Sequence, residues 1–138
     1  MRACGAVLTS QAALESLALQ NVGCSIHACR AVLELLAHSA ALKQLHLFNN
    51  MTGDEGAGFI GQLLGRSPNM ADFKLASSRV GPAGGIALAH GLCAGNHLTR
   101  LDLHDNPMTA DVVPELLRAL HHQAGLRHLN LNDTSLTN

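Results

Sequence analysis

The stretch LKQLHLFNNMTGDEGAGFIGQLLG (42–65) decides the fold, because two hydrophobic periods follow each other within it. Leu45 and Leu47 lie two residues apart and therefore face the same side of a short strand. After two asparagines, apolar residues recur at helical spacing for about three turns. The stretch predicts a strand, a turn and a returning helix.

The same pattern recurs along the chain in rows that start 28 residues apart, at Leu14, Leu42, Met70, Leu98 and Leu126. The rows open LESLALQNV, LKQLHLFNN, MADFKLASS, LTRLDLHDN and LRHLNLNDT. One such unit cannot bury its own inner face, so the rows must stack. We therefore predict an α/β leucine-rich-repeat horseshoe with a parallel inner sheet, outer helices and 28-residue repeats. It would form a single domain over residues 1–138 with an incomplete last repeat.

Composition narrows the classes of function. Apolar residues make up 47% and aromatic residues 2% of the chain, so the core must be aliphatic. The net charge of −1 argues against nucleic acid or an anionic membrane as the main partner. The apolar stretches are too short to span a membrane, and the N-terminus lacks a signal-peptide core, so we expect a cytoplasmic protein.

The cysteines and histidines do not suggest a metal site or an independent enzyme. The four cysteines fall where a small apolar residue would serve, and Cys24, His27 and Cys29 lack the second half of a zinc site. The nine histidines are scattered; His46 and His104 lie on expected strands, but no nucleophile accompanies them. We expect no metal and no cofactor.

Local signals predict where the helices begin. Ser25 and Thr109 are suitable helix caps, and Pro82 lies near a first helical position, where its missing N–H costs nothing. Because Pro114 would disrupt a helix starting at Thr109, we expect that helix to begin nearer Asp111.

Small residues recur after each turn, at Gly56, Ala57, Gly84 and Gly85. We interpret them as places where a missing side chain lets the helix approach the sheet, and not as a phosphate-binding loop, because the Lys-Ser/Thr ending is absent.

The ninth position of a row carries Asn50 and Asn106. We expect these side chains to point inward and bind the backbone of the turn and of neighbouring rows. Ser78 and Thr134 would do so less fully.

The eighth position of each row projects at the rim of the sheet, where the repeat itself does not require an amide. It carries Asn21, Asn49, Ser77, Asp105 and Asp133. Exposed polar residues at strand ends are where such scaffolds hold partners. We expect these residues to build one side of a binding surface together with Lys74, Arg79, Arg100, Asp102 and His104.

Three stretches, LHLFNNMTGDEGA, SSRVGPAGGIALAHGL and LTRLDLHDNPM, together resemble the Ran GTPase-activating proteins of plants and green algae. That family forms a leucine-rich-repeat crescent and has further repeats on both sides, so the resemblance implies a shortened form. It implies a partner, the small GTPase Ran in its GTP-bound form, and a role in nucleocytoplasmic transport, in the cytoplasm or at the nuclear envelope. The chain would regulate an enzyme without chemistry of its own.

The resemblance also implies which residues act. The family lacks an arginine finger, and a rim Asn helps to position the catalytic Gln of Ran, which orients the attacking water. The family motif Leu-x-x-Leu-x-Leu-x-Asn matches at Asn21 and at Asn49. Row order favours Asn21, with Asn49 as the alternative. Asp102 and Asp105 match positions expected to meet basic residues on Ran.

The alternative is a non-catalytic protein-interaction scaffold with the same fold, because fold does not determine function. Hydrolysis of GTP by Ran with and without the chain would separate the two hypotheses.

Overall fold

The structure, a computed structural model, describes residues 14–23, 25–36, 39–95 and 97–137. In this part of the chain five strands alternate with helices. The strands are β1 (Ser16–Gln20), β2 (Gln44–Phe48), β3 (Asp72–Ala76), β4 (Arg100–Asp102) and β5 (His128–Asn130). The helices are α2 (Ile26–Leu36), α3 (Gly53–Gly65), α4 (Pro82–Cys93) and α5 (Val113–His122), and a short 3-10 helix (Ala110–Val112) precedes α5.

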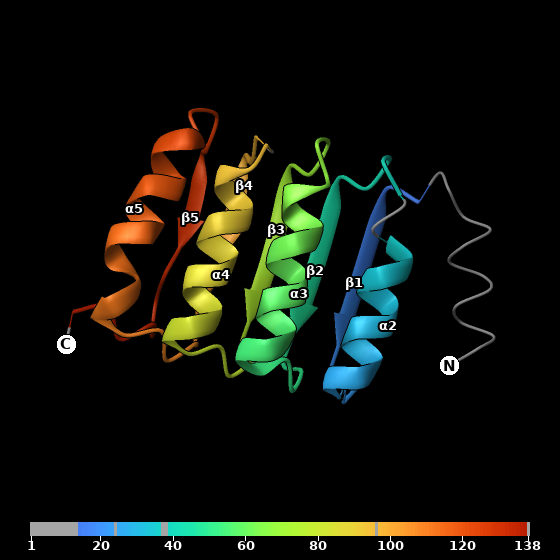
Figure 1. Cartoon of the computed structure of the whole chain (residues 1–138), viewed down its shortest axis with the longest axis horizontal. Coiled ribbons are helices and arrows are strands. Elements are labelled where there is room, and N and C mark those ends of the chain that lie inside the picture. Colours follow the sequence, from blue (N-terminus) through green and yellow to red (C-terminus); the bar gives the residue numbers. More distant parts are fainter. Residues whose placement is uncertain (1–13, 24, 37–38, 96, 138) are drawn as a thin grey trace.

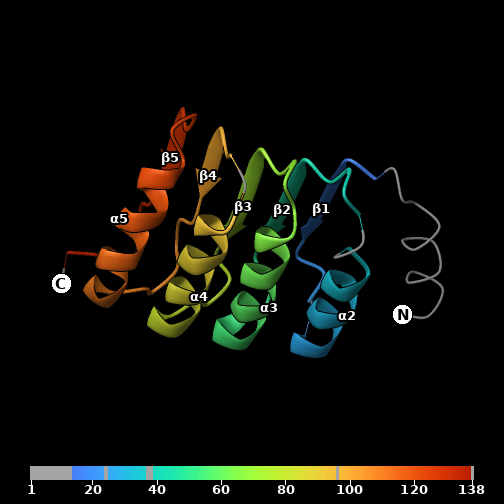
Figure 2. The same cartoon turned by 45° about the horizontal axis from the view of Figure 1, so that its top comes forward.

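The strands form one parallel sheet in chain order, β1-β2-β3-β4-β5. Paired residues lie 28 positions apart, as in Ser16 with Gln44 and Gln44 with Asp72. The helices cover one face of this sheet (Figure 1), and the turned view shows the same two layers (Figure 2). We call the opposite side of the sheet the open face. The predicted α/β class with a parallel sheet is confirmed, and the arrangement fits a leucine-rich-repeat-like fold.

The core lies between the sheet and the helices, and it is aliphatic as predicted. Leu45 and Leu47 of β2 are buried, whereas the residues that alternate with them are half-buried on the open face. The helices contribute residues such as Ile60, Leu88 and Leu116, at the predicted spacing. Phe73 is the one fully buried aromatic side chain in the described chain.

Three of the four expectations for helix starts are confirmed. Ser25 Oγ accepts a hydrogen bond from Ala28 N at 3.3 Å, Pro82 opens α4, and Pro114 lies in the first turn of α5. The expected cap at Thr109 is wrong, because its hydroxyl bonds Asp111 Oδ2 at 3.3 Å.

Gly84 and Gly85 bring elements of neighbouring repeats together, whereas a Cβ on Gly56 would lie 2.7 Å from Thr52 Cγ2 of its own turn. The nearest neighbours of these glycines are thus helix and turn residues and not the strand residues that we expected. A Cβ on Gly84 would lie 2.9 Å from Ala57 Cβ of α3, and a Cβ on Gly85 would lie 2.9 Å from Val112 Cγ2. Gly61 and Gly91 face each other across α3 and α4, and a Cβ on Gly91 would lie 2.8 Å from Gly61 Cα. The backbones of α3 and α4 thus approach too closely for side chains at these positions.

The ninth-position asparagines point inward, as predicted. Asn106 Oδ1 accepts hydrogen bonds from Ser78 N and Val80 N, both at 3.1 Å, and its Nδ2 donates to Leu75 O at 2.8 Å. Asn50 Nδ2 donates to Leu19 O at 2.9 Å, but within the described residues Asn50 Oδ1 is buried without a partner.

Ser78 and Thr134 occupy the same ninth position and make fewer hydrogen bonds to the main chain, as predicted. Ser78 Oγ donates to Ala76 O and Thr134 Oγ1 to Leu131 O, so each side chain bonds only its own turn. The side chains of Asn50 and Asn106, in contrast, bond the preceding repeat and so tie their turns to it.

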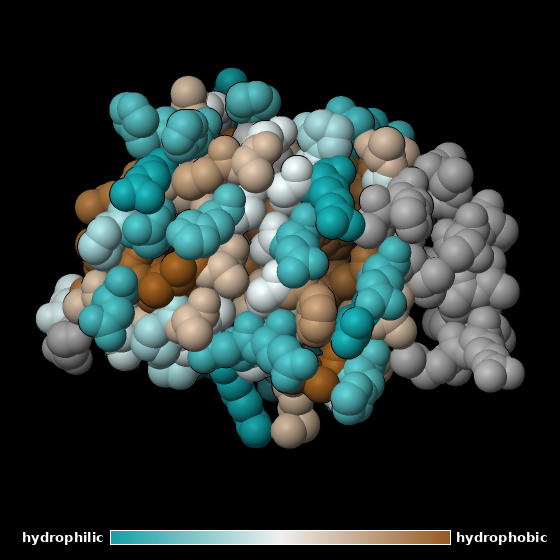
Figure 3. All heavy atoms as spheres, viewed as in Figure 1, coloured by the Kyte–Doolittle hydropathy of each residue, from teal (hydrophilic) through white to brown (hydrophobic). Residues whose placement is uncertain are grey.

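Among the described helices, none combines the length and apolar character that a membrane crossing requires. Outward-facing helix residues mix hydrophilic and apolar types (Figure 3).

Candidate functional site

The eighth-position residues share an uncommon backbone conformation at the rim of the sheet. The φ angles are positive at Asn21 (54°), Asn49 (50°), Ser77 (48°), Asp105 (54°) and Asp133 (56°). Glycine adopts this left-handed region freely, and Asn and Asp tolerate it better than the other residues that carry a side chain. Ser77, Asp105 and Asp133 hold this conformation without an amide, which agrees with our expectation that the repeat does not require an amide here. The backbone conformation nevertheless favours Asn or Asp at this position.

The two candidate catalytic residues, Asn21 and Asn49, are exposed and bonded to each other. Asn49 Nδ2 donates to Asn21 Oδ1 at 2.5 Å. Their backbone N–H groups donate to Phe48 O and Ala76 O of the next layer, both at 3.1 Å. The amide side chains therefore remain at the surface and are not used to satisfy the main chain.

Lys74, Asp102 and His104 come together on the open face at the middle of the sheet. Asp102 Oδ1 lies 2.7 Å from His104 Nδ1 and accepts a hydrogen bond from His104 N at 3.1 Å. Lys74 Nζ lies 3.7 Å from Asp102 Oδ2. A second pair joins His46 Nε2 to Asp72 Oδ1 at 2.9 Å. The open face is thus polar, and its acidic groups are paired across adjacent strands.

Asp102 is the carboxyl group on which this cluster depends. Burial raises its pKa, but hydrogen bonds from the ring and backbone N–H of His104, with the charges of His104 and Lys74, outweigh burial. The pKa of Asp102 is therefore lowered from its ordinary value of 3.8, and its ionised form stabilises the fold.

Of the other three expected binding residues, Arg100 adjoins this cluster, and Arg79 and Asp105 lie in turns. Arg100 is exposed at the start of β4, where it lines a hollow of about 410 Å³ with Asp102 of the cluster and with Arg127 and His128 of the next repeat. Arg79 and Asp105 are exposed in the turns that follow β3 and β4, and Arg79 has a positive φ of 58°. The structure thus places Arg100 beside the cluster of Lys74, Asp102 and His104, and Arg79 and Asp105 in the turns that follow the strands.

Phe48 is a feature of the open face that sequence reasoning missed. Lys74 Nζ lies 5.1 Å from the centre of its ring, and the His104 ring centre lies 6.1 Å away. The signal was present, because Phe48 alternates with the buried Leu47 and so had to face outward. Among the described residues it is the one Phe on this face, in a chain without Trp or Tyr.

The expected absence of a metal site stays a prediction for the whole chain. Within the described residues, no three His, Cys, Asp or Glu side chains are placed to hold a metal ion. Cys29 is buried in α2 and Cys93 is half-buried in α4, which agrees with their interpretation as small core residues. Cys4 and Cys24 lie outside the described residues.

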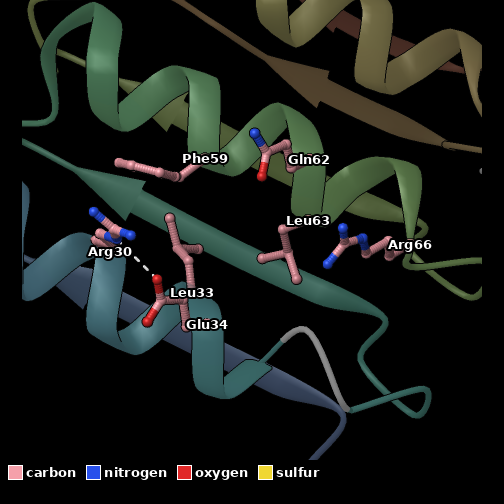
Figure 4. Close-up of a pocket in the computed structure, with 7 residues that line it drawn as sticks. All are labelled: Arg30, Leu33, Glu34, Phe59, Gln62, Leu63 and Arg66. Atoms are coloured by element: carbon pink, nitrogen blue, oxygen red, sulfur yellow. Dashed lines mark hydrogen bonds and ion pairs between the residues drawn. The ribbon is translucent and has the colours of Figure 1, made fainter.

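A separate groove of about 150 Å³ lies on the helix side between α2 and α3 (Figure 4). Leu33 and Leu63 form its apolar part, and Arg30 lies over the Phe59 ring at 5.0 Å. A hydrogen bond to Glu34, at 2.8 Å, and the charge of that carboxylate raise the pKa of Arg30. Leu33 and Leu63 are the repeat equivalents of Gly61 and Gly91, which follow them by 28 residues. Leucines therefore occupy, between α2 and α3, the positions at which glycines let α3 and α4 approach each other.

Two known proteins have sequences similar to this chain. No protein-family model matches the chain. It is 33% identical over 136 residues to "NACHT, LRR and PYD domains-containing protein 5" of Bos taurus. It is 30% identical over 135 residues to "NACHT, LRR and PYD domains-containing protein 13" of Homo sapiens.

Each alignment covers 97% of this chain but only 12% or 13% of the longer protein. The chain is thus similar to a small part of proteins whose names include leucine-rich repeats. Neither name mentions Ran or a GTPase.

Proposed function

We propose that this chain is a segment of a leucine-rich-repeat horseshoe, built from 28-residue repeats, that binds another protein across the open face and its rim. The observation that carries the proposal is the open face itself. Its side chains come from neighbouring parallel strands and pair with one another, as in His46–Asp72 and Lys74–Asp102. Such prepaired polar groups are already ordered, which lowers the entropy cost of binding a partner.

A protein fits this surface better than a small molecule or a substrate. The charges are spread along strands β2, β3 and β4, and the hollow beside Arg100, Asp102 and Arg127 holds only some of them, whereas a small-molecule site gathers its polar groups in one cavity. We therefore propose that the chain has no chemistry of its own and acts through its partner.

As the specific partner we propose the small GTPase Ran in its GTP-bound form, in the cytoplasm or at the nuclear envelope, with a role in nucleocytoplasmic transport. The resemblance of the three stretches to Ran GTPase-activating proteins motivates this partner. The exposed amides of Asn21 and Asn49 support it, because an amide used by the main chain could not reach the catalytic Gln of a GTPase. Positioning that Gln would speed hydrolysis without an arginine finger.

The positive φ at Asn21 and Asn49 decides which variants test this mechanism. Replacement by Ala would remove the amide and also strain the backbone, since φ is 54° and 50° there. Replacement by Gly removes the amide and keeps the conformation. Asn21→Gly and Asn49→Gly are therefore the informative variants. Asn69→Gly, before β3, is a control for loss of an amide away from the rim; it also removes the hydrogen bond from Asn69 Nδ2 to Ala40 O at 2.7 Å, so its urea midpoint is measured alongside.

Single-turnover GTP hydrolysis by Ran tests the catalytic mechanism. We expect acceleration by the unmodified chain and by Asn69→Gly, and a loss on the order of a hundredfold with the variant of the acting Asn, as for other groups that position a transition state. If both rim variants accelerate hydrolysis like the unmodified chain, the rim asparagines do not act catalytically.

The second candidate is an interaction segment without effect on hydrolysis, which the similarity to proteins named for leucine-rich repeats favours. A matched charge reversal tests the open face in both cases. Arg100→Glu changes the open face, whereas Arg66→Glu changes the helix side. We expect proteins captured from a cell extract, or purified Ran, to be lost with Arg100→Glu and kept with Arg66→Glu. If no bound protein distinguishes the two variants, the open face is not the binding surface.

A further inference from the structure

A hollow of about 210 Å³ opens on the open face where β1, β2 and β3 adjoin. Its lining comes from Ala18, Leu19, Gln20, His46, Phe48 and Lys74. Ala18, His46 and Lys74 are aligned across the three strands. The hollow exists because Ala18 is the short side chain of this row, beside the long side chains of His46 and Lys74.

We propose that this hollow holds one tyrosine side chain of a bound protein. The inference rests on the proposed function in that the tyrosine belongs to a protein partner. Three properties of the lining favour tyrosine: its apolar surface, its hydrogen-bond donors and its charges.

The apolar part of the lining suits an aromatic ring. Ala18, Leu19 and Phe48 supply apolar surface, and Phe48 is half-buried and aligned with Gln20 on one side and Ala76 on the other. Aromatic pairs contribute about 0.5–1.5 kcal/mol beyond the burial of their area. A ring inserted beside Phe48 would make such a pair.

The hydrogen-bond donors in the lining, from Lys74 and Gln20, favour an occupant whose tip accepts a hydrogen bond. Lys74 Nζ lies 3.7 Å from Asp102 Oδ2, which is longer than a hydrogen bond, so this ammonium group has N–H donors to offer. The Gln20 amide can donate as well. A tyrosine hydroxyl accepts a hydrogen bond, whereas a tryptophan N–H only donates.

The charges around the hollow disfavour an ionised occupant of either sign. A carboxylate would have to compete with Asp72 for His46 and with Asp102 for Lys74, because these two lining side chains already have acidic partners. A cation would meet the ammonium group of Lys74. An uncharged side chain with an apolar body and an accepting tip remains, and tyrosine has this form.

Nuclear magnetic resonance of the full chain with labelled alanine methyl groups tests the hollow directly. The probes are the N-acetyl amides of tyrosine, phenylalanine and glutamate. We expect the tyrosine probe to shift the Ala18 methyl signal saturably. The phenylalanine probe should bind on the order of threefold to tenfold more weakly, since it lacks one hydrogen bond. Glutamate binding as tightly as tyrosine, equal binding by phenylalanine, or no saturable shift with tyrosine would overturn the proposal.

Three variants test where the tyrosine probe binds. Ala18→Leu fills the hollow and should abolish the tyrosine-dependent shifts at neighbouring residues, and Phe48→Leu should weaken them. Ala83→Leu, an exposed alanine in the first turn of α4, is the matched control and should leave binding unchanged. The methyl signals of the buried Ala57 and Ala89 report whether each variant keeps its fold. Binding that survives Ala18→Leu in a folded variant contradicts the assignment.

The same variants separate this inference from the proposed function. If a protein partner is lost with Arg100→Glu but kept with Ala18→Leu, the open face binds the partner and the tyrosine hollow is wrong. If the tyrosine probe binds at Ala18 but no protein distinguishes Arg100→Glu from Arg66→Glu, the hollow stands and the proposed function fails.

Discussion

At the scale of single residues, two asparagines that adjoin in the sequence have opposite tasks. Asn50 turns inward and bonds Leu19 O, whereas Asn49 stays at the rim and bonds Asn21. The difference follows from the alternation of side chains at the end of a strand and from the positive φ of Asn49. A row of rim asparagines can therefore arise from backbone geometry, and function must be tested apart from it.

Substitutions at Asn49 should separate the two contributions. We expect Asn49→Ala to lower the free energy of unfolding by about 1–2 kcal/mol, because alanine is strained at a φ of 50°. Asn49→Gly should cost less, since glycine adopts this conformation without strain. Urea unfolding measures both. Equal losses would show that the hydrogen bond to Asn21, and not the backbone, sets the cost.

The pH dependence of stability should report on Asp102. Its pKa is lowered in the folded state from the ordinary value of 3.8, so its contribution is present above the unfolded pKa and is lost as the pH falls through the folded pKa. We expect the free energy of unfolding to fall below about pH 4. Asp102→Asn should remove this part of the decline. The check is urea unfolding at a series of pH values; parallel curves for the two proteins would contradict it.

At the scale of elements, the glycines of α3 and α4 determine how closely the helices pack. Leu33 and Leu63 stand 28 residues before Gly61 and Gly91, and between α2 and α3 the structure has a groove lined by those leucines (Figure 4). The positions of the strands and helices were predictable, because apolar residues recur with a period of two in a strand and of about 3.6 in a helix. Helix–helix distance was not, because it depends on which residues of two repeats meet.

Two glycine variants of the helices should change stability in opposite directions. Gly91→Ala places a Cβ against the backbone of Gly61 and should destabilise by on the order of 1–3 kcal/mol. Gly58→Ala meets no heavy atom within 4 Å in the described structure and should stabilise by up to about 1 kcal/mol through helix propensity. Urea midpoints measure both. A neutral Gly91→Ala would mean that α4 moves away from α3 at little cost.

At the scale of the whole molecule, most of the architecture was predictable and the site was predictable in part. Parallel strands, returning helices and inward Asn106 follow from spacing, because each repeat must bury its inner face against the next. The pairing of Asp102 with His104 and the hollow beside Ala18 were not predicted. Both depend on side-chain reach across neighbouring strands, which a one-dimensional pattern does not contain.

Stacked layers also predict how stability is distributed along the sheet. Phe73 and Leu75 of β3 are fully buried, and strands pair with β3 on both sides, whereas Leu129 of β5 is 45% exposed. Layers that contact only their neighbours can open from the ends. We expect amide hydrogens of β3 to exchange at least about tenfold more slowly than those of β1 and β5, as a difference of 1.4 kcal/mol would give. Hydrogen exchange followed by nuclear magnetic resonance measures this. Equal protection across the strands would show that the layers unfold as one cooperative unit and not from the ends of the sheet.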